Sequence, residues 1–261
     1  MRENIAISLG NRLSSEERDQ IAKAALRNMF LGFVELLYSI HSVEEVLDGI
    51  PWKGKEILEE SLKAGRGVIA VTAHIGNFTL IAAAMNLQGY PFRMIVKDPK
   101  HPRMARTFQQ LRERQGTQWI PALPPMRCQR EILRSLKRGE IVGFVADEGR
   151  RRGGIVMEFL GRRMAMPPGP AFYHLAINAP ILPVYLLRDE RQKLRMVVKP
   201  PLEFSLSGNR ERDLYLITRA VTRELEGTIR SHPHQWHWVS RVRPKIRTRR
   251  RAPEEMSFAG G

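Results

Sequence analysis

The chain alternates between short apolar runs and longer segments in which apolar residues recur every three or four positions. Apolar runs of roughly four to eight residues are typical of buried strands, and the longer spacing is typical of amphipathic helices. Strands are predicted at residues 67–71, 92–96, 118–120, 141–145, 181–187 and 194–198. Helices are predicted at residues 55–63, 79–87, 102–115, 127–137, 169–177 and 211–230. Strands separated by helices predict an α/β fold with a mostly parallel central sheet flanked by helices.

The last two predicted strands are an exception to this alternation. They are joined by residues 189–193, which are few and polar. A connection this short cannot carry the chain back to start a parallel strand. We therefore expect this pair to be antiparallel.

The N-terminal part of the chain predicts one long helix. Ser14 offers a hydroxyl N-cap, and acidic residues follow it in the first turn. Between Met29 and Tyr38 the one charged side chain is that of Glu35, so the helix is apolar around most of its circumference. Such a helix either packs into a protein core or rests on a bilayer surface, and the sequence leaves both interpretations open.

Composition limits the class of protein. The 261 residues include 43% hydrophobic residues, enough for a buried core. We expect an N-terminal apolar helical segment over residues 1–48, an α/β domain over 49–243 and a basic tail over 244–261. The formal net charge of +16 favours polyanionic partners: nucleic acid, anionic lipid or an acidic carrier protein. Nucleic acid is disfavoured, because no helix-turn-helix, zinc or RNA-binding signature accompanies the basic residues.

Several other classes are also disfavoured. The single Cys128 excludes a disulfide framework and indicates a reducing compartment. No signal-peptide pattern is recognisable, and polar residues and prolines interrupt the apolar tract 171–187, so any membrane contact is expected to be peripheral. His232, His234 and His237 lack a carboxylate or cysteine partner at a ligand spacing, so no metal site is expected. A serine hydrolase is disfavoured by the lack of a G-x-S-x-G elbow.

The residues with chemical potential fall into clusters near predicted strand ends. His74, followed by Gly76-Asn77, comes directly after the strand predicted at residues 67–71. A second group, which begins at Asp147, comes directly after the strand predicted at residues 141–145. The clusters are His74–Asn77; Asp147–Gly154; Glu158–Arg162, leading to Pro167–Pro170; and Ala179–Val184, with His232–Trp238 near the end. Residues after a strand end are held rigidly while they face solvent and substrate.

In this order and spacing the clusters resemble the late acyltransferases of lipid A biosynthesis, the lauroyl/myristoyl-transfer type, within the glycerolipid acyltransferase-like superfamily. That family shows H-x-G-N-[WF]-E, D-Q-x(n)-G-G-x3-[DE]-F-F-G, P-x-G-P, A-P-[IV]-[VL]-P-V and H-P-E-Q-W-x-W. The resemblance covers roughly residues 13–243. It implies transfer of an acyl chain from an acyl carrier protein or coenzyme A thioester to a hydroxyl of a lipid A precursor or related glycolipid, without a further cofactor. It also implies a peripheral position at the cytoplasmic face of the bacterial inner membrane, with an anionic glycolipid and the membrane surface as partners.

His74 is the candidate general base of such a transfer. A lipid hydroxyl is a poor nucleophile at neutral pH, and a histidine within hydrogen-bond reach can take its proton as it attacks the thioester carbonyl. The alternative is that His74 has a purely structural role at the end of a strand. The neighbouring clusters favour the catalytic interpretation.

Thr79 stands where the family motif has an acid. A threonine hydroxyl accepts a hydrogen bond but carries no charge to balance an imidazolium. Three interpretations remain: another carboxylate substitutes, His74 works alone at a reduced rate, or the chain is a non-catalytic or substrate-shifted lipid-binding homologue. The carboxylates in the matched motifs are Asp147, Glu148 and Glu158, and the first of these matches the aspartate of the family's D-Q pair.

A set of polar and basic residues is predicted to bind substrate. Arg150, Arg151 and Arg152 form a run in a glycine-flanked loop, which is either a solvated loop or a phosphate-binding site, because arginine offers paired donors to phosphate oxygens. The full set of candidates is Asn77, Thr79, Lys97, Arg150, Arg152 and Arg162. Trp236 and Trp238 are predicted to pack in the core or at an interface.

Overall fold

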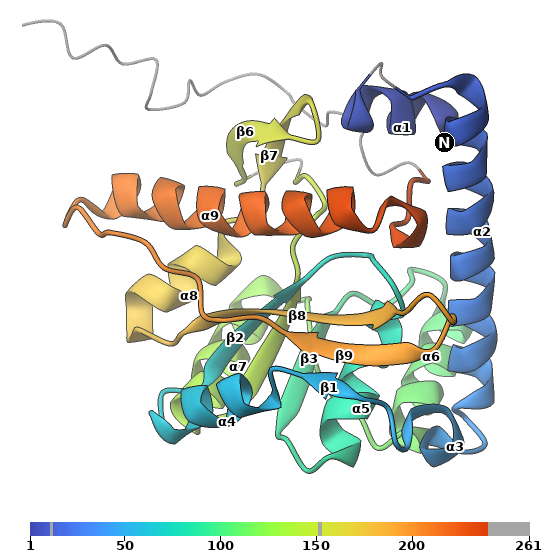
Figure 1. The fold of residues 1–261 in the computed structure, drawn as a ribbon. Helices are drawn as coiled ribbons and strands as arrows, with labels where there is room; N and C mark the ends of the chain where they lie inside the picture. Colours follow the sequence, from blue (N-terminus) through green and yellow to red (C-terminus); the bar gives the residue numbers. More distant parts are fainter. Residues whose placement is uncertain (11–12, 151–152, 240–261) are drawn as a thin grey trace, which may run out of the picture.

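The computed structural model describes residues 1–10, 13–150 and 153–239 of the chain (Figure 1). Its strands are β1 (Trp52–Lys53), β2 (Val68–Thr72), β3 (Phe92–Val96), β4 (Gln118–Pro121), β5 (Ile141–Val145), β6 (Ile155–Phe159), β7 (Arg162–Met166), β8 (Ile181–Arg188) and β9 (Leu194–Val198). Its α-helices are α1 (Arg2–Leu9), α2 (Ser15–Tyr38), α3 (Val43–Leu47), α4 (Lys55–Lys63), α5 (Ile81–Leu87), α6 (Pro102–Arg114), α7 (Pro125–Lys137), α8 (Gly169–Ile177) and α9 (Arg210–Ser231). Two 3-10 helices complete the set, η1 (Phe78–Leu80) and η2 (Pro233–Gln235).

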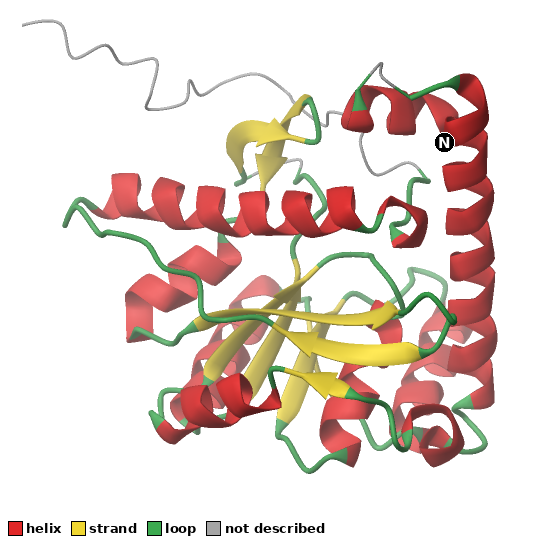
Figure 2. Ribbon diagram, in the orientation of Figure 1, coloured by secondary structure: helices red, strands yellow, loops and turns green. Residues whose placement is uncertain are grey.

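The central sheet has seven strands in the order β1-β9-β8-β2-β5-β3-β4. Strands β8, β2, β5, β3 and β4 pair in parallel, and β9 pairs in parallel with β1. The one antiparallel pair in this sheet is β8 with β9, as the short polar connection predicts. The predicted α/β fold with a mostly parallel sheet is therefore confirmed (Figure 2).

Helices cover both faces of the sheet because side chains alternate along each strand. In β2, Ile69 and Val71 belong to one buried cluster, which contains residues of α7, α8 and α9. Val68 and Ala70 belong to a second cluster on the other face, with residues of α4, α5 and α6. Burial on both faces explains why the strand reads as a continuous apolar run.

Helix α2 begins where the sequence predicts. The Ser14 hydroxyl accepts a hydrogen bond from the backbone N–H of Glu17, and the Glu17 carboxylate accepts one from the backbone N–H of Ser14, forming a capping box. The helix is the upright one along one side of the molecule, between α1 and α3 (Figure 1). One face packs against the domain and buries Ala25 and Leu36, whereas the opposite face leaves Phe30 70% exposed. The helix therefore packs on the core through one face and exposes apolar side chains on the other.

Within the described residues, no helix combines the length and the apolar character needed to cross a membrane.

The structure departs from the predicted elements in several places. Helices α1 and α3 lie in the N-terminal segment predicted to be helical, although the pattern gives no bounds for them, and the pattern does not predict the two-residue strand β1 or the β6–β7 hairpin. The helix predicted at residues 79–87 begins as the 3-10 turn η1 before it becomes α5. The predicted tail, residues 244–261, lies outside the described residues.

The hairpin is hidden from a sequence pattern by its turn. Leu160 and Gly161 connect β6 to β7 with φ angles of 51° and 71°. Such a turn is usually marked by asparagine or aspartate before glycine, so a leucine in the left-handed region gives no warning of it.

Candidate active site

Sheet register brings His74 and Asp147 together. Strands β2 and β5 are parallel neighbours, and their last residues, Thr72 and Val145, are register partners. Each candidate residue comes two positions after its strand ends, so both leave the sheet at the same edge. His74 Nδ1 lies 2.7 Å from Asp147 Oδ1. This edge, formed by the carboxyl ends of parallel strands, is where α/β sheets place their ligands.

Asp147 is fully buried and accepts three hydrogen bonds. The backbone N–H of His74 donates to Oδ2 over 3.0 Å, and the indole N–H of Trp236 donates to the same oxygen over 2.7 Å. Burial by itself raises the pKa of this carboxyl, but the neighbouring His74 and the hydrogen bonds from His74 and Trp236 outweigh it and lower the pKa to about 2. Asp147 is therefore an ionised acceptor at neutral pH.

This carboxylate fixes the state of the imidazole. An ionised acid only accepts hydrogen bonds, so the facing Nδ1 of His74 carries the hydrogen, as we assign it from the contacts. The other ring nitrogen, Nε2, is then left with a lone pair when the ring is neutral. The His74 side chain is 14% exposed, so part of the ring reaches solvent. The pair has the arrangement of a general base and its orienting acid.

A segment near the end of the described chain holds the turn that carries His74. The backbone N–H of Gly76 donates to the carbonyl of Gln235 over 3.0 Å, and that of His237 donates to the carbonyl of His74 over 3.0 Å. Between them, Ile75 and Trp236 form an isolated antiparallel bridge. The motif around Trp236 therefore holds the turn that carries His74 by hydrogen bonds as well as by core packing.

Glycine is required at position 76 for two reasons. Its φ angle is +58°, and a Cβ atom placed there would lie 2.1 Å from the carbonyl oxygen of Leu186. The next residue, Asn77, donates its backbone N–H to the same oxygen over 2.9 Å. The N–H groups of Gly76 and Asn77 are thus both engaged within the protein, so neither is available to stabilise an oxyanion.

The other two carboxylate candidates do not occupy the place of Asp147. Glu148 follows it and is exposed. Glu158 is exposed on β6 and lines a groove between this hairpin and α9, together with Arg163 and Arg219. Of the three acids that the sequence offers to replace the motif acid, Asp147 is the one in hydrogen-bond contact with His74.

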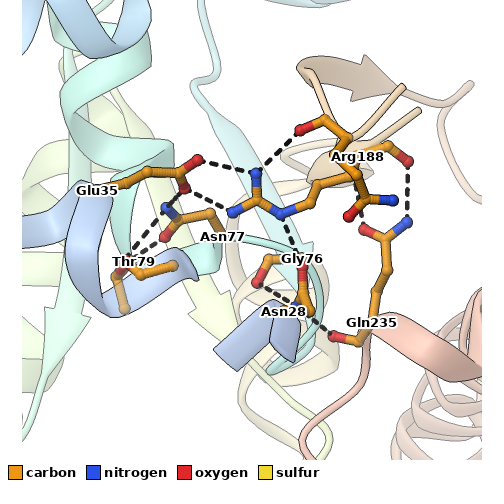
Figure 3. A network of polar contacts seen from close by, with 9 residues as sticks. Asn28, Glu35, Gly76, Asn77, Thr79, Arg188 and Gln235 are labelled. Carbon is orange, nitrogen blue, oxygen red and sulfur yellow. Dashed lines mark hydrogen bonds and ion pairs between the residues drawn. The ribbon is translucent and has the colours of Figure 1, made fainter. Parts of the chain in front are cut away.

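Thr79 and Asn77 face a different carboxylate. The Thr79 hydroxyl donates to Asn77 Oδ1 over 2.6 Å, and Asn77 Nδ2 donates to Glu35 Oε2 over 2.7 Å. Since a hydroxyl has one hydrogen, Thr79 has none left to give His74. Figure 3 shows Thr79 and Asn77 lying toward Glu35, which comes from α2.

Glu35 belongs to a polar network that sequence reasoning did not assign to the site. Its carboxylate binds the guanidinium of Arg188, which is buried at the end of β8, and both lie beside Gly76 (Figure 3). Asn28 and Gln235 complete the network. In the sequence, Glu35 and Arg188 are marked by being the single charge in the apolar part of α2 and the arginine at the end of an apolar strand.

The predicted basic residues lie in several places. Lys97 is exposed directly after β3. Arg150 is exposed, and its backbone N–H donates to the carbonyl of Ala165 on β7 over 2.7 Å. Arg162 is half-buried at the start of β7, and Arg152 lies outside the described residues. Their role in binding substrate stays a prediction.

An ordered set of metal ligands is not evident. In the part of the chain that the structure describes, no three His, Cys, Asp or Glu side chains gather closely enough to hold a metal ion.

The mostly parallel sheet, with the motif residues His74 and Asp147 at the carboxyl ends of its strands, agrees with the family resemblance. The chain belongs to the bacterial lipid A biosynthesis acyltransferase family, whose model matches residues 1–242.

Individual relatives carry two kinds of name. A phosphatidylinositol mannoside acyltransferase of Mycolicibacterium smegmatis is 29% identical over 199 residues, which is 74% of this chain and 63% of that protein. One from Mycobacterium tuberculosis is 26% identical over 187 residues, 71% of this chain and 57% of that protein. Lipid A biosynthesis acyltransferase 2 of Shigella flexneri is 21% identical over 235 residues, 87% of this chain and 73% of that protein. The chain thus spans less than two thirds of the mycobacterial relatives it matches.

Proposed function

We propose that this protein transfers a fatty acyl chain from a thioester donor to a hydroxyl of a glycolipid, with His74 as the general base. The observation that carries the proposal is the 2.7 Å contact between His74 Nδ1 and the buried carboxylate of Asp147. Asp147 orients the ring and balances the imidazolium that forms, so it performs the task that Thr79 cannot perform.

The reaction follows from this geometry. The acceptor hydroxyl attacks the thioester carbonyl carbon, and its proton passes to Nε2 of His74 as the new C–O bond forms. When the tetrahedral intermediate collapses, the C–S bond breaks and the imidazolium returns the proton to the departing sulfur. The products are an ester on the lipid and a free thiol on the donor, and His74 is again neutral.

The acceptor and donor are proposed by chemical class. The family's name specifies lipid A biosynthesis, and two relatives are named for acylation of a mannosylated phosphatidylinositol. Both acceptors are anionic glycolipids, and both kinds of thioester donor, acyl carrier protein and acyl coenzyme A, are also acidic. The net charge of +16 suits partners of this kind. No further cofactor enters the reaction as proposed.

The direct test is acyl transfer by purified protein from each donor to a lipid A precursor and to a phosphatidylinositol mannoside. His74→Ala should abolish transfer above background, because the variant lacks the proposed base. His41→Ala changes an exposed histidine on a different segment and should leave the rate unchanged. Full activity of His74→Ala excludes His74 as the base.

The alternative is a non-catalytic or substrate-shifted lipid-binding homologue, and Thr79 in place of the motif acid is what favours it. In that case glycolipid binding would be measurable, whereas no acyl product would form with either donor. The same assay therefore separates the two functions, provided that binding and turnover are measured on one preparation.

We further propose that the protein acts at the surface of an anionic membrane, which it contacts through the outer face of α2. This face, defined by Leu26, Phe30, Phe33, Val34 and Leu37, is exposed along the helix, with Val34 59% exposed. Lys23 and Arg27, about one turn apart at the N-terminal end of this face, lie on the same side and are also exposed. An apolar face extended by cations fits an interfacial helix on anionic lipid.

Vesicle sedimentation tests this contact. Binding should be stronger to vesicles with anionic lipid than to phosphatidylcholine vesicles, and it should weaken with salt. Phe30→Ser/Phe33→Ser should reduce binding, whereas Phe172→Ser, an exposed aromatic on α8, should not. If the wild-type protein does not bind the vesicles and forms a dimer that Phe30→Ser/Phe33→Ser does not form, the outer face of α2 is a contact between two copies of the chain instead.

A further inference from the structure

Glu35 on α2 reaches the catalytic turn in two ways. Directly, its Oε2 accepts the hydrogen bond from Asn77 Nδ2 over 2.7 Å. Indirectly, it binds Arg188, whose own backbone is tied to the same turn (Figure 3). The side chain comes from a helix that the sequence places well outside the motif around His74.

Arg188 needs this partner. Its side chain is 3% exposed, and a guanidinium keeps its charge at any pH that a folded protein meets. Its two terminal nitrogens donate to the two oxygens of Glu35 over 2.8 and 2.6 Å. Its Nε donates to Asn28 Oδ1 over 2.9 Å. A charge this buried is stable only when it is paired and hydrogen-bonded, so Glu35 fixes where Arg188 lies.

The position of Arg188 is passed on to the turn through Gln235. The Gln235 side-chain amide accepts from the backbone N–H of Arg188 over 2.8 Å and donates to its carbonyl over 2.9 Å. The Gln235 carbonyl then accepts from the N–H of Gly76. It also accepts from Asn28 Nδ2 over 3.1 Å. Asn28 on α2 therefore contacts both Arg188 and Gln235.

We propose that Glu35 and Arg188 are positioning residues for His74: besides Asp147, which faces the imidazole, α2 supplies a second carboxylate that holds the turn carrying His74 in place. The inference rests on the proposed acyl transfer for its kinetic consequence, although the geometry that it describes is independent of it. Asn28 and Glu35 are seven residues apart, so one face of α2 carries both contacts. The helix is therefore part of the site, and its outer face is the one proposed to meet lipid.

The test replaces the charge and keeps the shape. Glu35→Gln should lower kcat on the order of tenfold to a hundredfold, because a small displacement of a catalytic group has an effect of that size. The KM values for donor and acceptor should stay within about twofold, since the pair does not touch substrate as proposed. Glu35→Asp, which keeps the charge, should recover part of the rate.

Glu140→Gln is the matched control. Glu140 pairs with Arg138 over 2.7 Å immediately before β5 begins, at the other end of the strand from Asp147. Its loss should leave kcat within about twofold of the wild type, because this ion pair lies at the opposite end of β5 from the site.

A spectroscopic readout keeps this test separate from that of the function. The hydrogen on His74 Nδ1, which faces a buried carboxylate, should give a downfield proton resonance that His74→Ala removes. Glu35→Gln should shift or broaden this resonance, whereas Glu140→Gln should not. If the wild-type protein transfers no acyl group, the proposed function fails and the resonance alone decides the positioning role.

The proposal is overturned if Glu35→Gln folds and leaves both kcat and the His74 resonance unchanged. If Glu35→Gln does not fold, Asn77→Ser decides the question. This variant removes the direct link from Glu35 to the turn but leaves the buried ion pair intact. A lowered kcat with a shifted resonance then supports the proposal, and an unchanged resonance overturns it.

Discussion

Two carboxylates approach the turn that carries His74, and they do so from different environments. Asp147 is fully buried at the end of β5 and faces a histidine, whose charge changes with its protonation. Glu35 has a side chain 25% exposed on α2 and faces an arginine, whose charge never changes. Two tasks that one acid is often assumed to perform, support of proton transfer and support of the local structure, are thus divided between two carboxylates. The histidine partner suits proton transfer, and the ion pair with arginine suits the holding of shape.

The largest effect should come from Asp147→Asn, with a loss in kcat of about 10³- to 10⁴-fold, as for the orienting acid of serine proteases. Two N–H groups, from His74 and Trp236, donate to Oδ2, so the amide oxygen of an asparagine must stay there. The amide nitrogen then faces Nδ1 and forces the hydrogen onto Nε2, which loses its lone pair. Steady-state kinetics measure this, with Asp98→Asn as a surface control. A loss below about tenfold would mean that the tautomer is not set by Asp147.

The next effect concerns stability rather than rate. Glu35→Leu should lower the free energy of unfolding by about 3 kcal/mol, because it leaves the buried charge of Arg188 unpaired. Glu35→Leu/Arg188→Leu should recover most of this loss, since two apolar side chains can replace a buried ion pair. Urea unfolding of the two variants gives both values. Equal instability of the single and double variants would show that the unpaired charge is not the cause.

A smaller effect is expected from acid, which should lower the free energy of unfolding through protonation of Asp147. The pKa of Asp147 is lowered from 3.8 to about 2 in the folded state. A lowered folded pKa adds stability above the unfolded value, here about 2 kcal/mol, and this is lost as the pH falls from about 4 towards 2. Unfolding free energies measured across this range should therefore fall more steeply for the wild type than for Asp147→Asn. Parallel curves would contradict the lowered pKa.

The smallest effect is expected at Thr79. Its hydroxyl forms one hydrogen bond, to Asn77, on an exposed residue, so Thr79→Val should change kcat by no more than about threefold. The same acyl-transfer assay measures it. A loss comparable to that of Asp147→Asn would give Thr79 a direct part in the chemistry and would remove the division of tasks between the two carboxylates.

The sequence predicts the pair His74 and Asp147 better than the pair Glu35 and Arg188. His74 and Asp147 each follow an apolar run, so their place at strand ends is readable from the pattern alone. That β2 lies beside β5 is not readable, because strand order depends on which strands pair across the whole sheet. The sequence therefore names Asp147 among three candidates, and the register separates it from Glu148 and Glu158.

Glu35 and Arg188 could not be paired from sequence. They are distant along the chain, and each looks like an isolated interruption of an apolar segment. Their contact exists because α2 packs beside the end of β8, which local propensity does not encode. The same reason hides α1, whose Asn4 reaches the carbonyl of Trp238, so that tertiary contact rather than local pattern holds this helix in place.

The hydrogen bonds from the segment containing Gln235, Trp236 and His237 have a consequence for biosynthesis. During translation, the strands that carry His74 and Asp147 leave the ribosome long before this segment does. Until Trp236 arrives, Asp147 lacks one of its three donors and Gly76 lacks its acceptor. A nascent chain therefore carries both members of the pair before the hydrogen bonds around them are complete. The site proposed for acyl transfer therefore takes its final form only after this segment has been synthesised.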